Sequence, residues 1–320
     1  MRSKVLVLAL AATGVVGGGS AEEKQSAAAG TAVAQGGSLY TPVSDVAPHA
    51  AIGKDIAEIR ALLEPAAEGG DADFAGARKI WSGGRHSRKD DEPRTLEGFV
   101  EGDAVADLVG SALEGNGAAA GLDPAQRRQW VDKGIIAALE LKVLGELDAA
   151  IEKASAGETD PAEGAPHNVD EAWAFFTAEG EGLGATAERR AADFDVDGKV
   201  SEPVLEALAD AQSAAKSGDV PTLRTAREDA RGAMNRIFAL AVTKYAEEGV
   251  EDEVARAEGM AFPWGLRSDL AEERLERVQA AFEQPGTTAA ATARRTLNDS
   301  LDDLGLDRPL PTYEARPPSA

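Results

Sequence analysis

The chain has 320 residues, a formal net charge of −23 and no cysteine. A surface this acidic repels phosphate backbones and anionic lipid headgroups, which argues against nucleic-acid partners and peripheral membrane binding. The absence of cysteine excludes disulfides, thiol catalysis, iron–sulfur clusters and thiolate zinc sites.

The first 44 residues are typical of an export signal followed by a leader. Arg2 and Lys4 precede an apolar stretch that ends in small residues, and residues 1–21 are therefore predicted to be a cleaved signal peptide. The apolar stretch is shorter than the about 20 residues that a transmembrane helix needs. Residues 22–44, rich in Ala, Gly, Ser, Thr and Gln, predict a flexible leader. We therefore expect a periplasmic or secreted protein without stable membrane insertion.

The segment 45–305 predicts an all-α domain, a multi-helix bundle of about ten helices. Only 5% of the residues are aromatic, and no segment shows the alternation typical of strands. Two weakly related helical halves are an alternative, because Glu171 and Glu258 are both followed by small and aromatic residues. The proline-rich segment 306–320 predicts a disordered tail. The expected helices are 50–64, 72–81, 95–114, 124–154, 168–191, 201–216, 219–248, 250–262, 268–283 and 287–303.

Several acidic residues fall on apolar helix faces. Glu140 shares the stripe of Ile136 and Val143, and Glu258 lies between Val254 and Phe262. A buried carboxylate must be paired, hydrogen-bonded, bound to a metal or protonated. These positions therefore predict either a ligand site or a structural ion network.

A histidine and a glutamate are spaced to share a helix face. His167 precedes Glu171 by one turn, so both side chains can point the same way. With Glu140 and Glu258 they form a predicted ligand set of oxygens and one nitrogen, which suits iron, manganese or zinc. His49 stands alone near a helix start and is interpreted as a surface residue.

Basic residues offer possible partners for this ligand set. Arg231, Arg227 and Asn235 share the apolar face of 219–248. We expect Arg231 to orient a carboxylate or to hold an anion such as carbonate, since a guanidinium binds a planar oxyanion through two hydrogen bonds. Arg85 and His86, in a Gly-containing loop, could close the site, or could simply belong to a solvated loop.

One segment partly matches a calcium-binding loop. Asp193, Asp195 and Asp197 occupy the first, third and fifth positions. The twelfth position is Val204, where a bidentate carboxylate is required, so calcium is disfavoured.

Five short motifs, in order along the chain, resemble a known family. They are Phe74-Ala-Gly-Ala-Arg78-Lys-Ile-Trp81-Ser-Gly-Gly84, Arg94-Thr-Leu-Glu-Gly-Phe99, Asp170-Glu171-Ala-Trp173-Ala-Phe175, Arg189-Arg190-Ala-Ala-Asp-Phe194 and Glu258-Gly-Met-Ala-Phe262. They look like the low-iron-inducible periplasmic Fe-assimilation proteins of algae and their bacterial relatives. The resemblance implies an exported helical protein that captures or delivers iron rather than a redox enzyme.

The residues and the resemblance together predict an exported protein that holds iron between its helices. Carboxylate-rich ligation would favour Fe³⁺ over Fe²⁺, and a membrane iron transporter is an expected partner. The alternative is an envelope scaffold or interaction bundle whose buried Arg/Glu network is purely structural. A metal-dependent hydrolase is a third hypothesis, but the chain has no His-Glu-x-x-His, Gly-x-Ser-x-Gly or P-loop motif, so we do not expect an enzyme.

Overall fold

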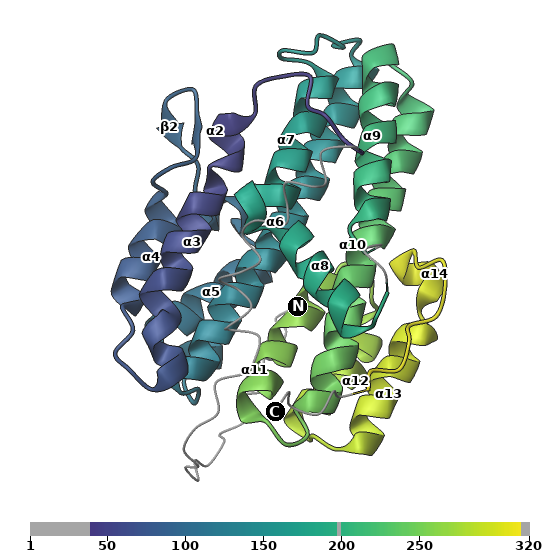
Figure 1. Cartoon of the computed structure of the whole chain (residues 1–320). Helices are drawn as coiled ribbons and strands as arrows, with labels where there is room; N and C mark the ends of the chain where they lie inside the picture. The colour runs from purple at the N-terminus through teal and green to yellow at the C-terminus, as the bar shows by residue number, and fades with distance from the viewer. Residues whose placement is uncertain (1–38, 197–199, 315–320) are drawn as a thin grey trace.

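Helices make up nearly all the regular structure of residues 39–196 and 200–314, the ranges that the computed structural model describes (Figure 1). The prediction of an all-α, multi-helix fold is confirmed. The only strands in these ranges form the short hairpin β1 (Arg88–Lys89) and β2 (Glu92–Pro93). The α-helices are α2 (Ala47–Ala50), α3 (Ile52–Leu63), α4 (Phe74–Gly83), α5 (Ala104–Glu114), α6 (Pro124–Ser155), α7 (Ala165–Thr177), α8 (Leu183–Asp193), α9 (Glu202–Ser217), α10 (Val220–Glu248), α11 (Glu253–Ala261), α12 (Glu272–Glu283), α13 (Thr287–Asn298) and α14 (Leu301–Leu304). Short 3-10 helices are η2 (Glu64–Glu68), η3 (Glu97–Val100), η4 (Gly117–Ala119), η5 (Ala178–Gly180) and η6 (Phe262–Leu266).

The two longest helices begin where the sequence predicts. The Asp123 carboxylate accepts a hydrogen bond from the backbone of Gln126, whose side chain accepts from the Asp123 backbone, so α6 starts with a complete capping box. Asp219 caps α10 through the backbone N–H of Thr222. A proline follows within the first turn in both helices, where its missing N–H costs nothing.

Helices α6 and α10 run through the molecule and carry most of its packing (Figure 1). Helix α6 contacts α5, α7 and α11, whereas α10 contacts α9, α11 and α13. Because α6 has neighbours on several sides, it buries residues all round, including Lys133, Glu140 and Glu146. The polar groups on α6 must therefore find partners inside the protein.

The segment 168–191, expected to be one helix, is divided between α7 and α8. Ala178 and Glu179 break the helix because both adopt positive φ angles, 41° and 49°. Helix α3 packs closely against this corner: a Cβ placed on Gly53 would lie only 2.0 Å from the carbonyl oxygen of Ala178. This position therefore requires glycine.

Residues 39–44 and 306–314, the described parts of the predicted leader and tail, pack against the helices. The segment 39–46, which we call the strap, begins beside α9 and runs over α7 to the start of α2 (Figure 1). Its Tyr40 is only 3% exposed. At the other end Leu310 is buried, and the Tyr313 hydroxyl donates to Glu248. Tyr40 and Leu310 reach the core and fix the two segments. The average composition of the segments did not indicate these anchors. The predicted signal peptide 1–21, residues 22–38 and residues 315–320 lie outside the described residues.

None of the helices in the described ranges has the length and apolar character required to cross a bilayer.

Candidate metal centre

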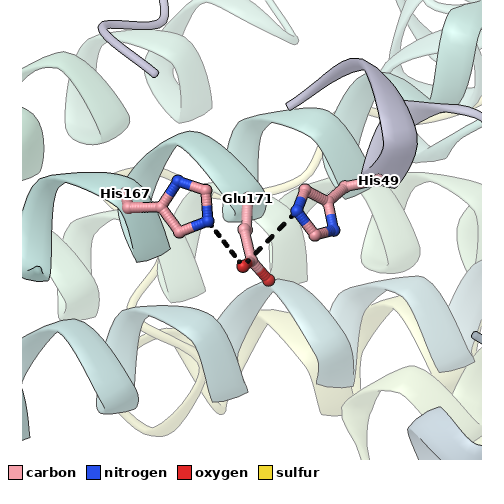
Figure 2. A group of neighbouring side chains, drawn as sticks. All are labelled: His49, His167 and Glu171. Atoms are coloured by element: carbon pink, nitrogen blue, oxygen red, sulfur yellow. Dashed lines mark ion pairs between the residues drawn. The ribbon is translucent and has the colours of Figure 1, made fainter. Parts of the chain in front are cut away.

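Three side chains from two segments meet inside the protein at the His–Glu cluster, composed of His49, His167 and Glu171 (Figure 2). The Glu171 Oε1 atom lies 3.1 Å from His167 Nε2 and 3.6 Å from His49 Nε2. One ligand atom from each residue lies within 4.8 Å of the other two. Two imidazole nitrogens and one carboxylate oxygen thus converge at the spacing that a single cation requires.

The local sequence explains how these side chains are positioned. His167 and Glu171 are one turn apart on α7, which begins after Gly164 with Pro166 in its first turn. The predicted contact between these two side chains is present. His49 comes from the four-residue helix α2, which follows the strap and packs against α7.

His49 is 6% exposed, contrary to its interpretation as a surface residue. Its ring lies edge-on to Phe175 and His167, with centroid separations of 6.2 Å and 5.7 Å. A histidine surrounded by polar and small residues in sequence gives no periodic signal of burial. His49 is buried because the strap packs against α7, and this tertiary contact leaves no local pattern in the sequence.

The second oxygen of Glu171 is held by an arginine. Arg94 Nη2 donates to Glu171 Oε2 at 2.7 Å, and Arg94 Nη1 lies 3.7 Å from Glu146 on α6. Lys142 and Asn168 complete the bonding of Glu146, with contacts of 2.6 Å each. Arg94 thus orients the Glu171 carboxylate so that Oε2 is occupied and Oε1 faces the imidazoles.

The surroundings of Glu171 and His49 shift the pKa values of both groups. Burial raises the pKa of Glu171, but the hydrogen bond from His167 and the charge of Arg94 outweigh it, so the pKa lies well below its usual value. Burial lowers the pKa of His49 to about 4, although Glu171 opposes the shift. Near neutral pH, Glu171 is therefore ionised and His49 carries a free lone pair, as metal ligation requires.

Glu258, predicted as a further ligand, lies elsewhere. It belongs to what we call the Lys–Glu cluster, composed of Lys133, Tyr245 and Glu258. Lys133 Nζ lies 2.7 Å from Glu258 Oε1, and the Tyr245 hydroxyl donates to the same oxygen at 2.5 Å. Lys133 also contacts Asp132 at 2.7 Å. The positive charge beside Glu258 thus comes from the chain itself.

Glu140 is also buried but does not reach the His–Glu cluster. It is 1% exposed, and its Oε2 atom has no hydrogen-bond partner. Burial, followed by the charge of Asp269, raises its pKa well above the usual value, and Arg267 and Arg231 only partly offset this shift. The helical phase therefore located a buried carboxyl group, but not one beside His167.

Arg231 and Asn235 are occupied by protein groups near Glu140. Arg231 Nη1 donates to Asp269 at 2.6 Å and its Nε donates to Glu228 at 2.8 Å. Asn235 donates to the other Asp269 oxygen and to the carbonyl oxygen of Leu304. These contacts tie α10 to the segment that follows η6 and to the end of α14.

The remaining predicted residues lie apart from the cluster. Arg227 pairs with Asp148 at 3.0 Å. Arg85 and His86, both exposed, contact Glu58 on α3 at 2.7 Å and 2.8 Å. The Asp193 carboxylate pairs with Arg190 at 2.9 Å, Asp195 adopts a positive φ of 52°, and Asp197 lies outside the described residues.

Sequence reasoning thus missed two residues of this region, His49 and Arg94. Arg94 opens one of the motifs that carry the family resemblance, and this position was the available signal. For His49 the available signal was weak: a Pro-His pair at a helix start, next to a leader that contains a tyrosine.

Fold and site together define an all-α protein with a buried two-histidine, one-carboxylate cluster between its helices. The sequence model of the family Fea1, described as low iron-inducible periplasmic protein, matches residues 4–252, and the chain belongs to this family. The resemblance found in the sequence is therefore confirmed, and the family description connects the chain to iron and to the periplasm. No match was found among curated proteins or among solved structures.

Proposed function

We propose that this protein captures iron in the periplasm and holds the ion at the His–Glu cluster. The observation that carries the proposal is the convergence of ligand atoms from His49, His167 and Glu171 within 4.8 Å of one another. The cluster lies inside a member of a low iron-inducible family. Iron is the cargo here, to be bound and passed on, and the membrane transporter expected from the resemblance is the proposed recipient.

The donor set favours Fe²⁺ in this proposal. The sequence-based preference for Fe³⁺ depended on three carboxylates around the ion, but Glu140 and Glu258 have other neighbours. Two imidazoles and one carboxylate are the donors of many Fe²⁺ sites, with coordination positions left for water or another ligand. Arg231 is bound to Asp269 and Glu228, so the carbonate considered for it is not part of the proposal.

A binding experiment on the full chain tests the proposal. Anaerobic titration with Fe²⁺ and thermal unfolding with and without the ion would be compared for wild type, His49→Ala and Glu171→Gln. We expect wild type to unfold at a higher temperature with Fe²⁺. Each substitution should weaken binding at least about 100-fold, because it removes one of three protein ligands.

Two matched controls separate the site from its surroundings. His86→Ala removes an exposed imidazole, and Glu258→Gln neutralises an equally buried glutamate on α11. Both should bind Fe²⁺ like wild type. If wild type shows no iron-dependent stabilisation, the proposal is wrong, and the alternative of a scaffold with structural ion pairs is favoured.

A further inference from the structure

We infer that Ser44 and Asp170 form a positioning chain that fixes the ring of His167 and docks the strap that carries His49. Neither residue would touch the ion. The part of this inference that concerns iron affinity rests on the proposed function, whereas the part that concerns the His167 ring does not.

Asp170 is completely buried and accepts hydrogen bonds from the strap and from α9. Its Oδ1 accepts from the Tyr40 hydroxyl at 2.6 Å and from Gln212 Nε2 at 2.8 Å. Its Oδ2 accepts from the backbone N–H groups of Val43 and Ser44, both at 2.8 Å. One carboxylate on α7 therefore clamps the strap immediately before α2.

The Ser44 hydroxyl extends this arrangement toward the site. Ser44 Oγ lies 2.7 Å from Asp170 Oδ2 and 2.9 Å from His167 Nδ1. The carboxylate oxygen can only accept, so the single hydroxyl proton of Ser44 is donated to Asp170. A lone pair on Ser44 Oγ then accepts from His167 Nδ1, which must therefore carry a proton.

This proton placement sets the direction of the metal-binding nitrogen. With Nδ1 bonded to Ser44, Nε2 is the nitrogen that faces Glu171 Oε1 at 3.1 Å. Without an ion, Nε2 donates a hydrogen bond to this oxygen, and a bound ion would take the place of that proton. A hydrogen bond to the far nitrogen of a ligating histidine commonly fixes its tautomer and orientation in metal sites. Ser44 supplies that bond and Asp170 orients Ser44.

The same clamp also determines the position of His49. The strap leads directly into α2, so its attachment to Asp170 brings His49 against α7. Asp170 and Glu171 are neighbours in sequence, yet one holds the strap and the other faces both imidazoles. Docking of the strap and assembly of the His–Glu cluster are therefore one event.

The test uses Ser44→Ala in the full chain. The substitution removes the acceptor for His167 Nδ1 but leaves the backbone and Tyr40 bonds to Asp170 in place, so the fold should persist. With ¹⁵N-labelled histidine, and only three histidines to assign, NMR reports which ring nitrogen is protonated. Wild-type His167 should carry a proton on Nδ1, and Ser44→Ala should lose this proton and keep only the one on Nε2, beside Glu171.

Fe²⁺ affinity provides the second measurement. Ser44→Ala should weaken binding about 10–100-fold, the usual cost of removing such a partner, and Ser44→Thr, which keeps the hydroxyl, should restore it. Ser82→Ala, which removes an exposed hydroxyl bonded to the Arg78 carbonyl oxygen, should change neither the protonation of His167 Nδ1 nor the affinity.

The outcomes separate this inference from the proposed function. If Ser44→Ala keeps both the proton on His167 Nδ1 and wild-type affinity, the positioning chain is disproved. If wild type carries this proton, Ser44→Ala loses it, and neither protein binds Fe²⁺, the positioning chain stands and the proposed function fails.

Discussion

The His–Glu and Lys–Glu clusters share a local design. In each, a buried glutamate is followed one turn later by a phenylalanine: Glu171 by Phe175 and Glu258 by Phe262. In each, a basic side chain lies over the ring, with Arg94 at 5.2 Å from the Phe175 centroid and Lys133 Nζ at 5.8 Å from the Phe262 centroid. The resemblance between the two stretches noticed in the sequence thus corresponds to similar surroundings.

The difference lies in which group faces the glutamate oxygen. Glu258 Oε1 meets the ammonium group of Lys133, a cation that belongs to the chain. Glu171 Oε1 meets two imidazoles, while its cationic neighbour Arg94 binds the opposite oxygen. A buried glutamate alone therefore does not indicate a metal site. A glutamate can bind an external cation only if the neighbouring side chains are metal ligands rather than a cationic group of the chain itself.

The largest expected effect comes from removing the internal cation. Lys133→Met should destabilise the protein by about 3–5 kcal/mol, because it leaves Glu258 buried without its charge partner. Urea unfolding would measure the loss, and Fe²⁺ binding should be unchanged. Lys133→Met combined with Glu258→Met should recover much of the stability. A single variant as stable as wild type would contradict the structural role of the pair.

Glu140 permits a sharper test, because it is a buried glutamate with neither kind of partner. Glu140→Leu should stabilise the protein by about 1–3 kcal/mol near neutral pH, since it replaces an unsatisfied buried carboxyl with an apolar group of similar size. Glu146→Leu, at a fully bonded position on the same helix, should instead destabilise it. If both substitutions changed the free energy of unfolding equally, the distinction between the unsatisfied Glu140 and the bonded Glu146 would be wrong.

The pH dependence of the Glu140→Leu effect has a definite sign. The pKa of Glu140 is raised in the folded state, chiefly by burial and then by Asp269. The raised pKa therefore contributes to the free energy of unfolding of wild type at pH values below about 4.3, the pKa of a glutamate in the unfolded chain. This contribution is lost as the pH rises toward the pKa of the folded state. The advantage of Glu140→Leu, measured by urea unfolding across this range, should grow with pH. A constant difference would mean that Glu140 does not titrate with unfolding.

The smallest effect is expected at Arg94. Arg94→Lys keeps the positive charge but loses the guanidinium geometry that holds Glu171 Oε2, so Fe²⁺ affinity should fall about tenfold, or 1.4 kcal/mol. Titration with Fe²⁺ would measure the change. Arg78→Lys, which alters a surface pair with Glu97, serves as the control and should bind normally. An unchanged affinity in Arg94→Lys would mean that charge alone orients Glu171.

Much of the fold could be predicted because helix periodicity, capping aspartates and first-turn prolines are local signals. The all-α class and the starts of α6 and α10 follow from them. The break at Ala178 could not be predicted this way, because it depends on the close approach of α3 at Gly53.

The candidate site was only partly predictable for the same reason. The contact between His167 and Glu171 follows from their spacing on one helix. The arrival of His49 and Arg94 depends on the strap and on the segment after the hairpin, which approach from elsewhere in the chain. The phases of Glu140 and Glu258 indicated burial, but a phase does not say which neighbouring helix supplies the partner.

Helix α6 contributes Lys133 to the Lys–Glu cluster and places Lys142 and Glu146 beside the His–Glu cluster, and it also carries the buried Glu140. Each residue added to or removed from its middle would rotate everything beyond that point by about 100°. Such a change would turn Glu146 away from Arg94, or Lys133 away from Glu258. We therefore expect α6 to resist insertions and deletions along its whole length.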